Sequence, residues 1–183
     1  MKPQIQTHSG KVIDFAEPEK SQYTIEDIAH GLMNTCRYSG QCNRFYSVGL
    51  HSFIVASLVE PEFELEALMH DATEAFMADI PTPLKILLPA YREIEKRMDL
   101  EIRRQHGIRE TPSPEVKAAD ALALAIEKPV LMGKSTIAWE LPDTSGIEPT
   151  RLEFIQNLIA GRGTMTMSKG IFISLYRDLK GLS

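Results

Sequence analysis

His70 and Asp71 stand side by side in the chain, with His51 before them and Asp120 after them. Apolar residues flank all four side chains, which indicates positions facing a protein interior. Burying an imidazole or a carboxylate is unfavourable unless another group pairs with it. A divalent metal ion would pair with all four at once. The pattern therefore predicts a metal site with His51, His70, Asp71 and Asp120 as its ligands.

This ligand set also indicates which metals fit and what they would do. Adjacent residues of a helix point about 100° apart, so His70 and Asp71 need ligands from other elements to complete a site, and His51 and Asp120 are the natural ones. Two imidazoles and two carboxylates suit Zn, Mn, Co or Fe(II) better than Ca. Such an ion activates water and polarises a phosphoryl oxygen, which favours hydrolysis of a phosphate ester.

Glu74 is the candidate acid or base for this chemistry. It follows Asp71 by three residues and His70 by four, so one helical face could bring its carboxylate close to the metal without ligating it. A residue placed there can transfer a proton during hydrolysis. The alternative is a solvated helix residue, which is the usual position of a glutamate.

Three further residues flank the predicted site and could bind a substrate. Arg37 and Lys85 could neutralise phosphate charge, the arginine in a bidentate manner and the lysine as a point charge. Asp79 could orient a water, a ribose hydroxyl or a metal ligand. The structural alternatives are a charge at a helix C-terminus for Arg37, a solvated side chain for Lys85 and an N-cap for Asp79.

Apolar residues at helical spacing predict the elements that position these side chains. A capping-box pattern at Thr24 to Asp27 starts a helix that runs to Cys36, and a second helix carries His51 on its apolar face. A third helix covers Glu64 to Met77 and ends before a rigid proline loop at 80–83. A fourth helix is expected to end at His106-Gly107, and a fifth to begin at 112–114 and to carry Asp120. An irregular loop from Pro129 to Pro149, which Trp139 could anchor, precedes two further helices.

The fold class that follows is all-α, a bundle of about six to seven helices in a single domain over residues 1–183. A small hairpin around Ser9-Gly10 precedes the bundle.

The net charge of -5 gives no general attraction to a nucleic-acid polymer or to an anionic membrane. We find neither a signal-peptide pattern nor an apolar run of the ~20 residues needed to span a membrane, so we expect a cytoplasmic protein. Cys36 and Cys42 fit neither a zinc knuckle nor a C-x-x-C pair, and we expect reduced thiols.

The order His51, His70-Asp71, Asp120 resembles the H…HD…D pattern of the HD-domain metal-dependent phosphohydrolases, over roughly residues 20 to 130. The segments Arg37-Tyr38, Asp71 to Glu74 and Asp79 to Lys85 are similar to those of the small 5'-deoxynucleotidases of that superfamily. The resemblance implies that the arginine binds phosphate, that the aromatic residue lies beside the sugar and that the glutamate serves the attacking water. Tyr38 stands where those enzymes commonly have tryptophan, and packing is its alternative role.

The block from Cys36 to Gly40, with Arg44 to Val48 and His51-Ser52, resembles compact phage-type HD enzymes, some of which are dATP triphosphohydrolases. Ala75 departs from the alarmone hydrolases, which have a second acid there, and the Gly-Tyr-Pro element of the cyclic-dinucleotide phosphodiesterases is absent. We therefore expect a metal-dependent hydrolase of 2'-deoxynucleotides that forms a homo-oligomer, in the host cytoplasm if a phage encodes it. The alternatives are a phosphohydrolase for another nucleotide and a non-catalytic metal-bearing nucleotide sensor.

Overall fold

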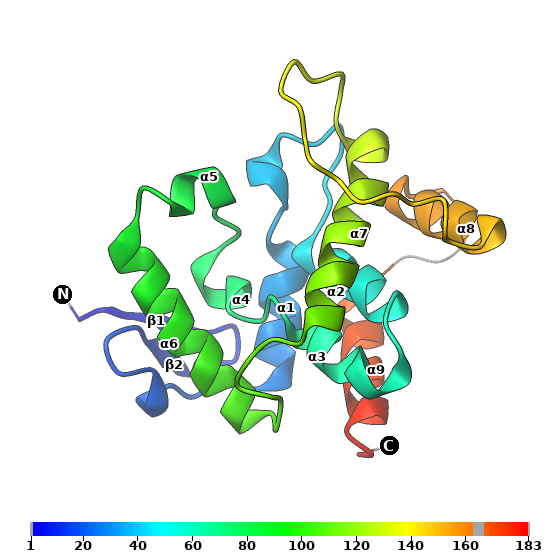
Figure 1. Cartoon of the computed structure of the whole chain (residues 1–183). Helices are drawn as coiled ribbons and strands as arrows, with labels where there is room; N and C mark the ends of the chain where they lie inside the picture. The colour runs from blue at the N-terminus through cyan, green and yellow to red at the C-terminus, as the bar shows by residue number, and fades with distance from the viewer. Residues whose placement is uncertain (1, 163–166, 183) are drawn as a thin grey trace.

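The computed structural model describes residues 2–162 and 167–182 and confirms an all-α fold with a small N-terminal hairpin (Figure 1). Strands β1 (Gln4–Gln6) and β2 (Val12–Asp14) pair antiparallel, with Ile5 opposite Ile13. The turn between them contains Gly10 at φ 86°, a left-handed conformation that glycine adopts without strain. Ile13 is fully buried, so the hairpin is packed against the helices.

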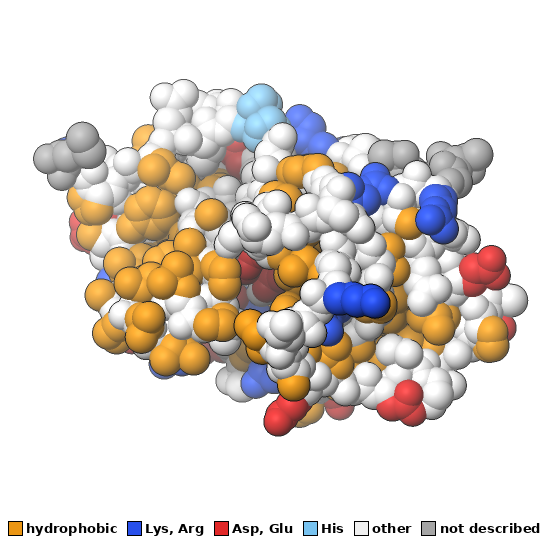
Figure 2. Space-filling model, turned by 90° about the horizontal axis from the view of Figure 1, so that it is seen from above, with side chains coloured by type: hydrophobic (Ala, Val, Ile, Leu, Met, Phe, Trp, Pro, Cys, Tyr) orange, Lys and Arg blue, Asp and Glu red, His pale blue; other side chains and the backbone are white. Residues whose placement is uncertain are grey.

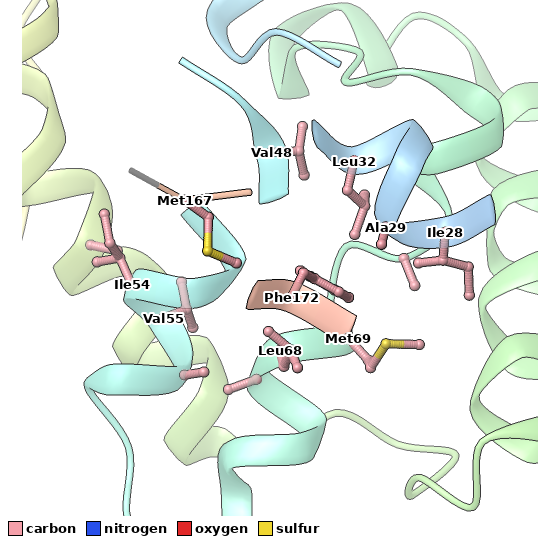
Figure 3. Close-up of a cluster of buried hydrophobic side chains, with 14 of the residues drawn as sticks. Ile28, Ala29, Leu32, Val48, Ile54, Val55, Leu68, Met69, Met167 and Phe172 are labelled. Carbon is pink, nitrogen blue, oxygen red and sulfur yellow. The ribbon is translucent and has the colours of Figure 1, made fainter. Parts of the chain in front are cut away.

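The helical core is built where the apolar spacing places it. Helix α1 (Ile25–Asn34) starts with the predicted capping box of Thr24 and Asp27, and α2 (Val48–Ser57) is buried on most of its circumference. Figure 3 shows Phe172 of the last helix, α9 (Lys169–Leu179), among apolar side chains of α1, α2 and α3 (Glu64–Met69). Phe172 has no exposed surface, so α9 closes the core from the C-terminal end of the chain.

The prediction of one helix over 64–77 is wrong, because the chain breaks into α3, a turn at residues 70–73 and α4 (Glu74–Met77). Within the turn the hydrogen bonds join residues three apart, such as Glu74 N–H to the carbonyl of Asp71 at 2.9 Å. His70 Nδ1 lies 2.7 Å from the carbonyl oxygen of Ala67, the acceptor that the amide of Asp71 would use in an unbroken helix. The His70 side chain thus occupies the carbonyl group to which the backbone amide of Asp71 would otherwise donate.

Two loop boundaries also differ from the prediction. The segment after the prolines contains a short helix, α5 (Thr82–Lys85), because a proline in the first turn of a helix gives up no backbone hydrogen bond. Helix α7 (Pro114–Leu131) continues past Pro129, and the amide of Met132 still bonds the carbonyl of Lys128 at 2.9 Å. The predicted loop therefore covers residues 132–148, before α8.

The other elements connect these helices. They are η1 (Pro18–Lys20), η2 (Tyr38–Gly40), η3 (Pro61–Phe63), α6 (Pro89–Gln105) and α8 (Pro149–Ile159). His106 caps the end of α6, as the sequence predicts. Among the described residues, none of the helices combines the length and the apolar character needed to cross a lipid bilayer.

Helices α1 and α4 approach each other closely at Gly31. A Cβ atom at this position would lie 2.4 Å from the carbonyl oxygen of Ala75, which is far inside van der Waals contact with backbone that cannot rotate away. Only glycine permits this approach. Because Ala75 follows Glu74 directly, the contact fixes the position of Glu74 against the core.

Candidate metal centre

Four side-chain atoms converge at one point in the helical bundle. His51 Nε2 lies 3.0 Å from Asp120 Oδ1 and 3.7 Å from Asp71 Oδ2. His70 Nε2 lies 3.1 Å from Asp71 Oδ2 and 4.0 Å from Asp120 Oδ1. Ligands about 2.1 Å from a shared ion are themselves roughly 3 to 4 Å apart. The arrangement therefore fits a single divalent ion, and His51, His70 and Asp120 form a cluster that could hold one.

The tautomers of the two histidines support this fit. His51 Nδ1 lies 2.6 Å from Glu127 Oε1, and His70 Nδ1 lies 2.7 Å from the carbonyl oxygen of Ala67. With each Nδ1 donating to an oxygen, each Nε2 presents its lone pair to the shared point. Both Nε2 atoms are buried, and neither makes a well-oriented hydrogen bond within the described chain. A metal ion would satisfy both of them.

The electrostatics of the site also favour a cation. Burial and Arg37 act to lower the pKa of His51, but the carboxylates of Glu127 and Asp120 outweigh them and raise it to about 9. Burial acts to raise the pKa of Asp71, but the two histidines and Arg37 outweigh it and hold it well below its ordinary value. The carboxylates around His51 thus favour a positive charge at Nε2, which a divalent ion would supply in place of a proton, and the aspartate stays ionised, as a metal ligand must be.

Glu127 is a further candidate site residue, which the sequence pattern does not reveal. It is fully buried on α7, and its Oε1 accepts from Tyr46 OH at 2.8 Å as well as from His51. Its Oε2 accepts from Tyr38 OH at 2.7 Å and lies 3.5 Å from Arg37 Nε. Burial acts to raise its pKa, but His51 and Arg37 outweigh it and lower the pKa to about 2. Glu127 therefore stays ionised and connects the candidate ligand His51 to Arg37 and Tyr38, two of the four residues predicted to bind substrate.

The Arg37-Tyr38 segment reaches the candidate metal centre as predicted, although Tyr38 also has a structural partner. Arg37 Nη1 lies 3.6 Å from Asp71 Oδ2, and its side chain is only 12% exposed. The backbone amide of Tyr38 donates to Asp79 Oδ2 at 3.1 Å. Asp79 thus holds the backbone of the segment, and Glu127 holds its aromatic ring. Binding of a sugar by Tyr38 and of a substrate group by Asp79 stay predictions.

Glu74 lies buried beside the metal ligands at the start of α4. Burial raises the pKa of its carboxyl to about 10, and the negative charges of Asp71 and Asp79 add to the effect. Its Oε2 is buried without a hydrogen-bond partner, and its Oε1 lies 3.9 Å from Lys85 Nζ. Burial thus favours the protonated form of the Glu74 carboxyl, whose Oε2 has no competing partner in the described structure. This is the state of a group that can donate a proton.

A cleft of about 970 Å³ opens from the metal centre toward α6. His70, Asp71, Glu74 and Lys85 line its inner end. Lys85 Nζ also contacts Glu95 Oε1 of α6 at 2.5 Å, so its positive charge lies between the carboxyl groups of Glu74 and Glu95 on opposite sides of the cleft. Figure 2 shows acidic side chains at the bottom of a hollow, with hydrophobic side chains gathered to one side, where α5 and the residues after it expose Leu84 and Ile86 to Leu88.

Replacing Glu127 by glutamine is expected to weaken metal binding about 10- to 100-fold, the usual effect of losing the outer partner of a ligating histidine. Glutamine keeps the volume but removes the charge that orients and polarises His51. Competition with a chromophoric chelator would measure the affinity. Glu115→Gln, an exposed change on the same helix, is the matched control. A folded Glu127→Gln protein with unchanged metal affinity would contradict the role of Glu127.

The fold and its four converging side chains define an all-α protein with a candidate site for a divalent metal ion. The chain belongs to the same family as the uncharacterized protein YfdR of Escherichia coli (strain K12), to which it is 39% identical over 178 residues, 97% of this chain and 96% of YfdR. An uncharacterized protein of Rhodobacter capsulatus is 33% identical over 141 residues, 69% of this chain and 72% of its own length. No family model matches the chain.

Proposed function

We propose that the protein is an HD-type metal-dependent phosphohydrolase that acts on 2'-deoxynucleotides. The observation that carries this proposal is the convergence of His51, His70, Asp71 and Asp120, in the H…HD…D order, on a point that one ion would fill. A structural role for the four residues would leave two buried Nε2 atoms without a well-oriented hydrogen bond among the described residues. The cleft is lined by two of these residues, His70 and Asp71, and would give a substrate access to the site.

A divalent metal bound there would lower the pKa of a water and polarise a phosphoryl oxygen. The residues of the chain would supply the rest of the catalysis. Arg37 and Lys85 would hold the phosphate oxygens and balance their charge. Glu74 would move the proton to the leaving oxygen, because burial favours the protonated form of its carboxyl and Oε2 has no hydrogen-bond partner among the described residues. Rate enhancement would come from positioning and charge stabilisation.

The preference for a deoxy sugar is supported by the environment of Tyr38. Its hydroxyl is already bonded to Glu127 and its amide to Asp79, so the carbon face of the ring is what it can offer to a sugar. A ribose 2'-hydroxyl placed against that face would lose its hydrogen bonds to water and gain none, which is unfavourable. A 2'-deoxyribose avoids this loss.

The test is hydrolysis of the four deoxynucleoside monophosphates and the four triphosphates, each with Mn²⁺, Co²⁺ or Zn²⁺, beside the matching ribonucleotides. We expect metal-dependent release of phosphate or triphosphate, with deoxynucleotides preferred. No product from any deoxynucleotide, by protein whose metal content has been measured, would overturn the proposal. Calorimetry in that case would identify a nucleotide sensor by tight binding without turnover, and turnover of ribonucleotides alone would indicate a different phosphohydrolase.

A further inference from the structure

Trp139 lies next to Tyr38, although the two are 101 positions apart in the sequence. Their ring centroids are 6.5 Å apart and the rings are tilted by 44°. Residues 132–148, the irregular segment at the top of Figure 1, bring Trp139 to this place from the end of α7. Trp139 is the only tryptophan of the chain, and 36% of its surface is exposed. The segment therefore presents an aromatic surface to solvent beside the candidate site.

A continuous row of side chains connects Trp139 to the metal ligands. Arg37 Nη1 lies 3.6 Å from Asp71 Oδ2, and the guanidinium carbon of Arg37 lies 5.4 Å from the centre of the Tyr38 ring. The ring of Trp139 comes next. Leading away from the metal centre, the row consists of a cation, a tyrosine ring and a tryptophan ring. A nucleoside 5'-phosphate has its phosphate, sugar and base in the same order.

The aromatic pair is held in place while leaving ring surface for a ligand. Glu127 and Asp79 fix Tyr38 through its hydroxyl and its amide. Lys128 Nζ lies 5.3 Å from the centre of the Trp139 ring, which places a cation over one face of the indole. The tilt between Tyr38 and Trp139 prevents full contact of their faces, so the exposed part of the indole remains available for stacking.

We propose that Trp139, with Tyr38 beside it, is the stacking site for the base of the nucleotide substrate. The inference rests on the proposed function, because it assumes that the phosphate of a nucleotide binds at the candidate metal centre and that the sugar and base extend from there. Stacking on an aromatic ring is tolerant of base identity because every base has a π-face. Trp139 therefore supplies affinity for a base in general, and does not itself choose among the four bases.

Fluorescence tests this subsite without any catalytic step, because Trp139 is the only tryptophan that can report. The wild-type protein is titrated with the four 2'-deoxynucleosides, which have no phosphate to lose, and with 2-deoxyribose alone. We expect saturable quenching of tryptophan emission by deoxynucleosides and none by the sugar. Ile137→Ala, which changes an exposed apolar residue of the same segment, is expected to keep the quenching. Emission that no deoxynucleoside alters would overturn the proposal, whatever the activity of the protein.

Steady-state kinetics provide the second test. Trp139→Ala is expected to raise the KM for deoxynucleoside monophosphates about 10-fold, in line with the usual loss of one base-stacking contact, and to change kcat little. Trp139→Phe should recover most of the loss. Hydrolysis of 2-deoxyribose 5-phosphate, which has no base, should be the same in wild type and Trp139→Ala. Equal KM values for nucleotides in both proteins would refute the stacking role, whereas quenching without any turnover would reject the proposed function and leave the base site standing.

Discussion

Asp71→Ala is expected to abolish metal binding and all metal-dependent hydrolysis. Asp71 Oδ2 is the ligand atom closest to His70 Nε2, at 3.1 Å, and it also approaches Arg37. Its removal takes away one of four ligands and leaves the arginine charge facing two imidazoles. The loss of affinity should exceed the roughly 10- to 100-fold effect of removing an outer partner. Metal content after dialysis, measured by mass spectrometry, and phosphate release would both fall to background.

Glu93→Ala is the matched control for this experiment, because Glu93 is an exposed carboxylate that lines the same cleft away from the four ligands. It should retain one equivalent of metal and near-normal turnover. Circular dichroism would show whether Asp71→Ala keeps its helices. An Asp71→Ala protein that is folded and still retains metal through dialysis would show that the ion is held elsewhere.

Glu74→Gln is expected to retain metal binding, unlike Asp71→Ala. Its kcat should fall about 10²- to 10⁴-fold, the typical contribution of a general acid or base. Glutamine has the volume of glutamic acid but has no proton to donate at neutral pH. Glu74 Oε2 has no hydrogen-bond partner within the described chain, so the amide would break no existing contact there. Parallel measurements of metal content and of single-turnover rate would separate binding from chemistry.

The stability of Glu74→Gln gives an independent check on the same residue. The pKa of Glu74 is raised in the folded protein to about 10, so the folded state binds its proton more tightly than the unfolded chain does. The contribution of Glu74 to the free energy of unfolding is largest below pH ~4.5, the ordinary pKa of a glutamate, and decreases as the pH rises toward 10. The metal-free glutamine variant should therefore unfold at a higher urea concentration than wild type at pH 8. A lower urea midpoint for Glu74→Gln than for wild type, together with a normal kcat, would contradict the role of Glu74 as a buried, protonated acid.

The sequence indicates the four converging side chains because burial of several ionisable residues has few explanations. His51 and Asp120 could be placed on helical faces by spacing alone, and the structure brings both to the same point as His70 and Asp71. The helix starts at Thr24 and Pro114 follow from local capping and from the tolerance for proline in a first helical turn. Such features are determined by neighbouring residues, so no tertiary information is needed.

The errors arise where distant or side-chain contacts override the local pattern. The apolar spacing over 64–77 is helical throughout, and the interruption comes from the His70 ring bonding a backbone carbonyl. Glu127 lies within a helix of ordinary composition, and its role depends on Tyr38, Tyr46 and His51, which lie 76 to 89 positions away. The sequence indicates only that Trp139 could anchor its loop, because its proximity to Tyr38 depends on how residues 132–148 fold back.

Asp120 and Glu127 share one continuous helix, and this sets a constraint on chain length within the family. Seven residues correspond to almost two full turns, so both side chains project from nearly the same side of α7 toward His51. Inserting or deleting one residue between them would rotate one carboxylate by about 100° relative to the other. The number of residues between 120 and 127 is thus constrained in addition to the identities of Ala123 and Ile126, which are buried in the core. In an alignment of relatives, a gap placed between these two acids would mark either an alignment error or a protein whose histidine has lost its outer partner.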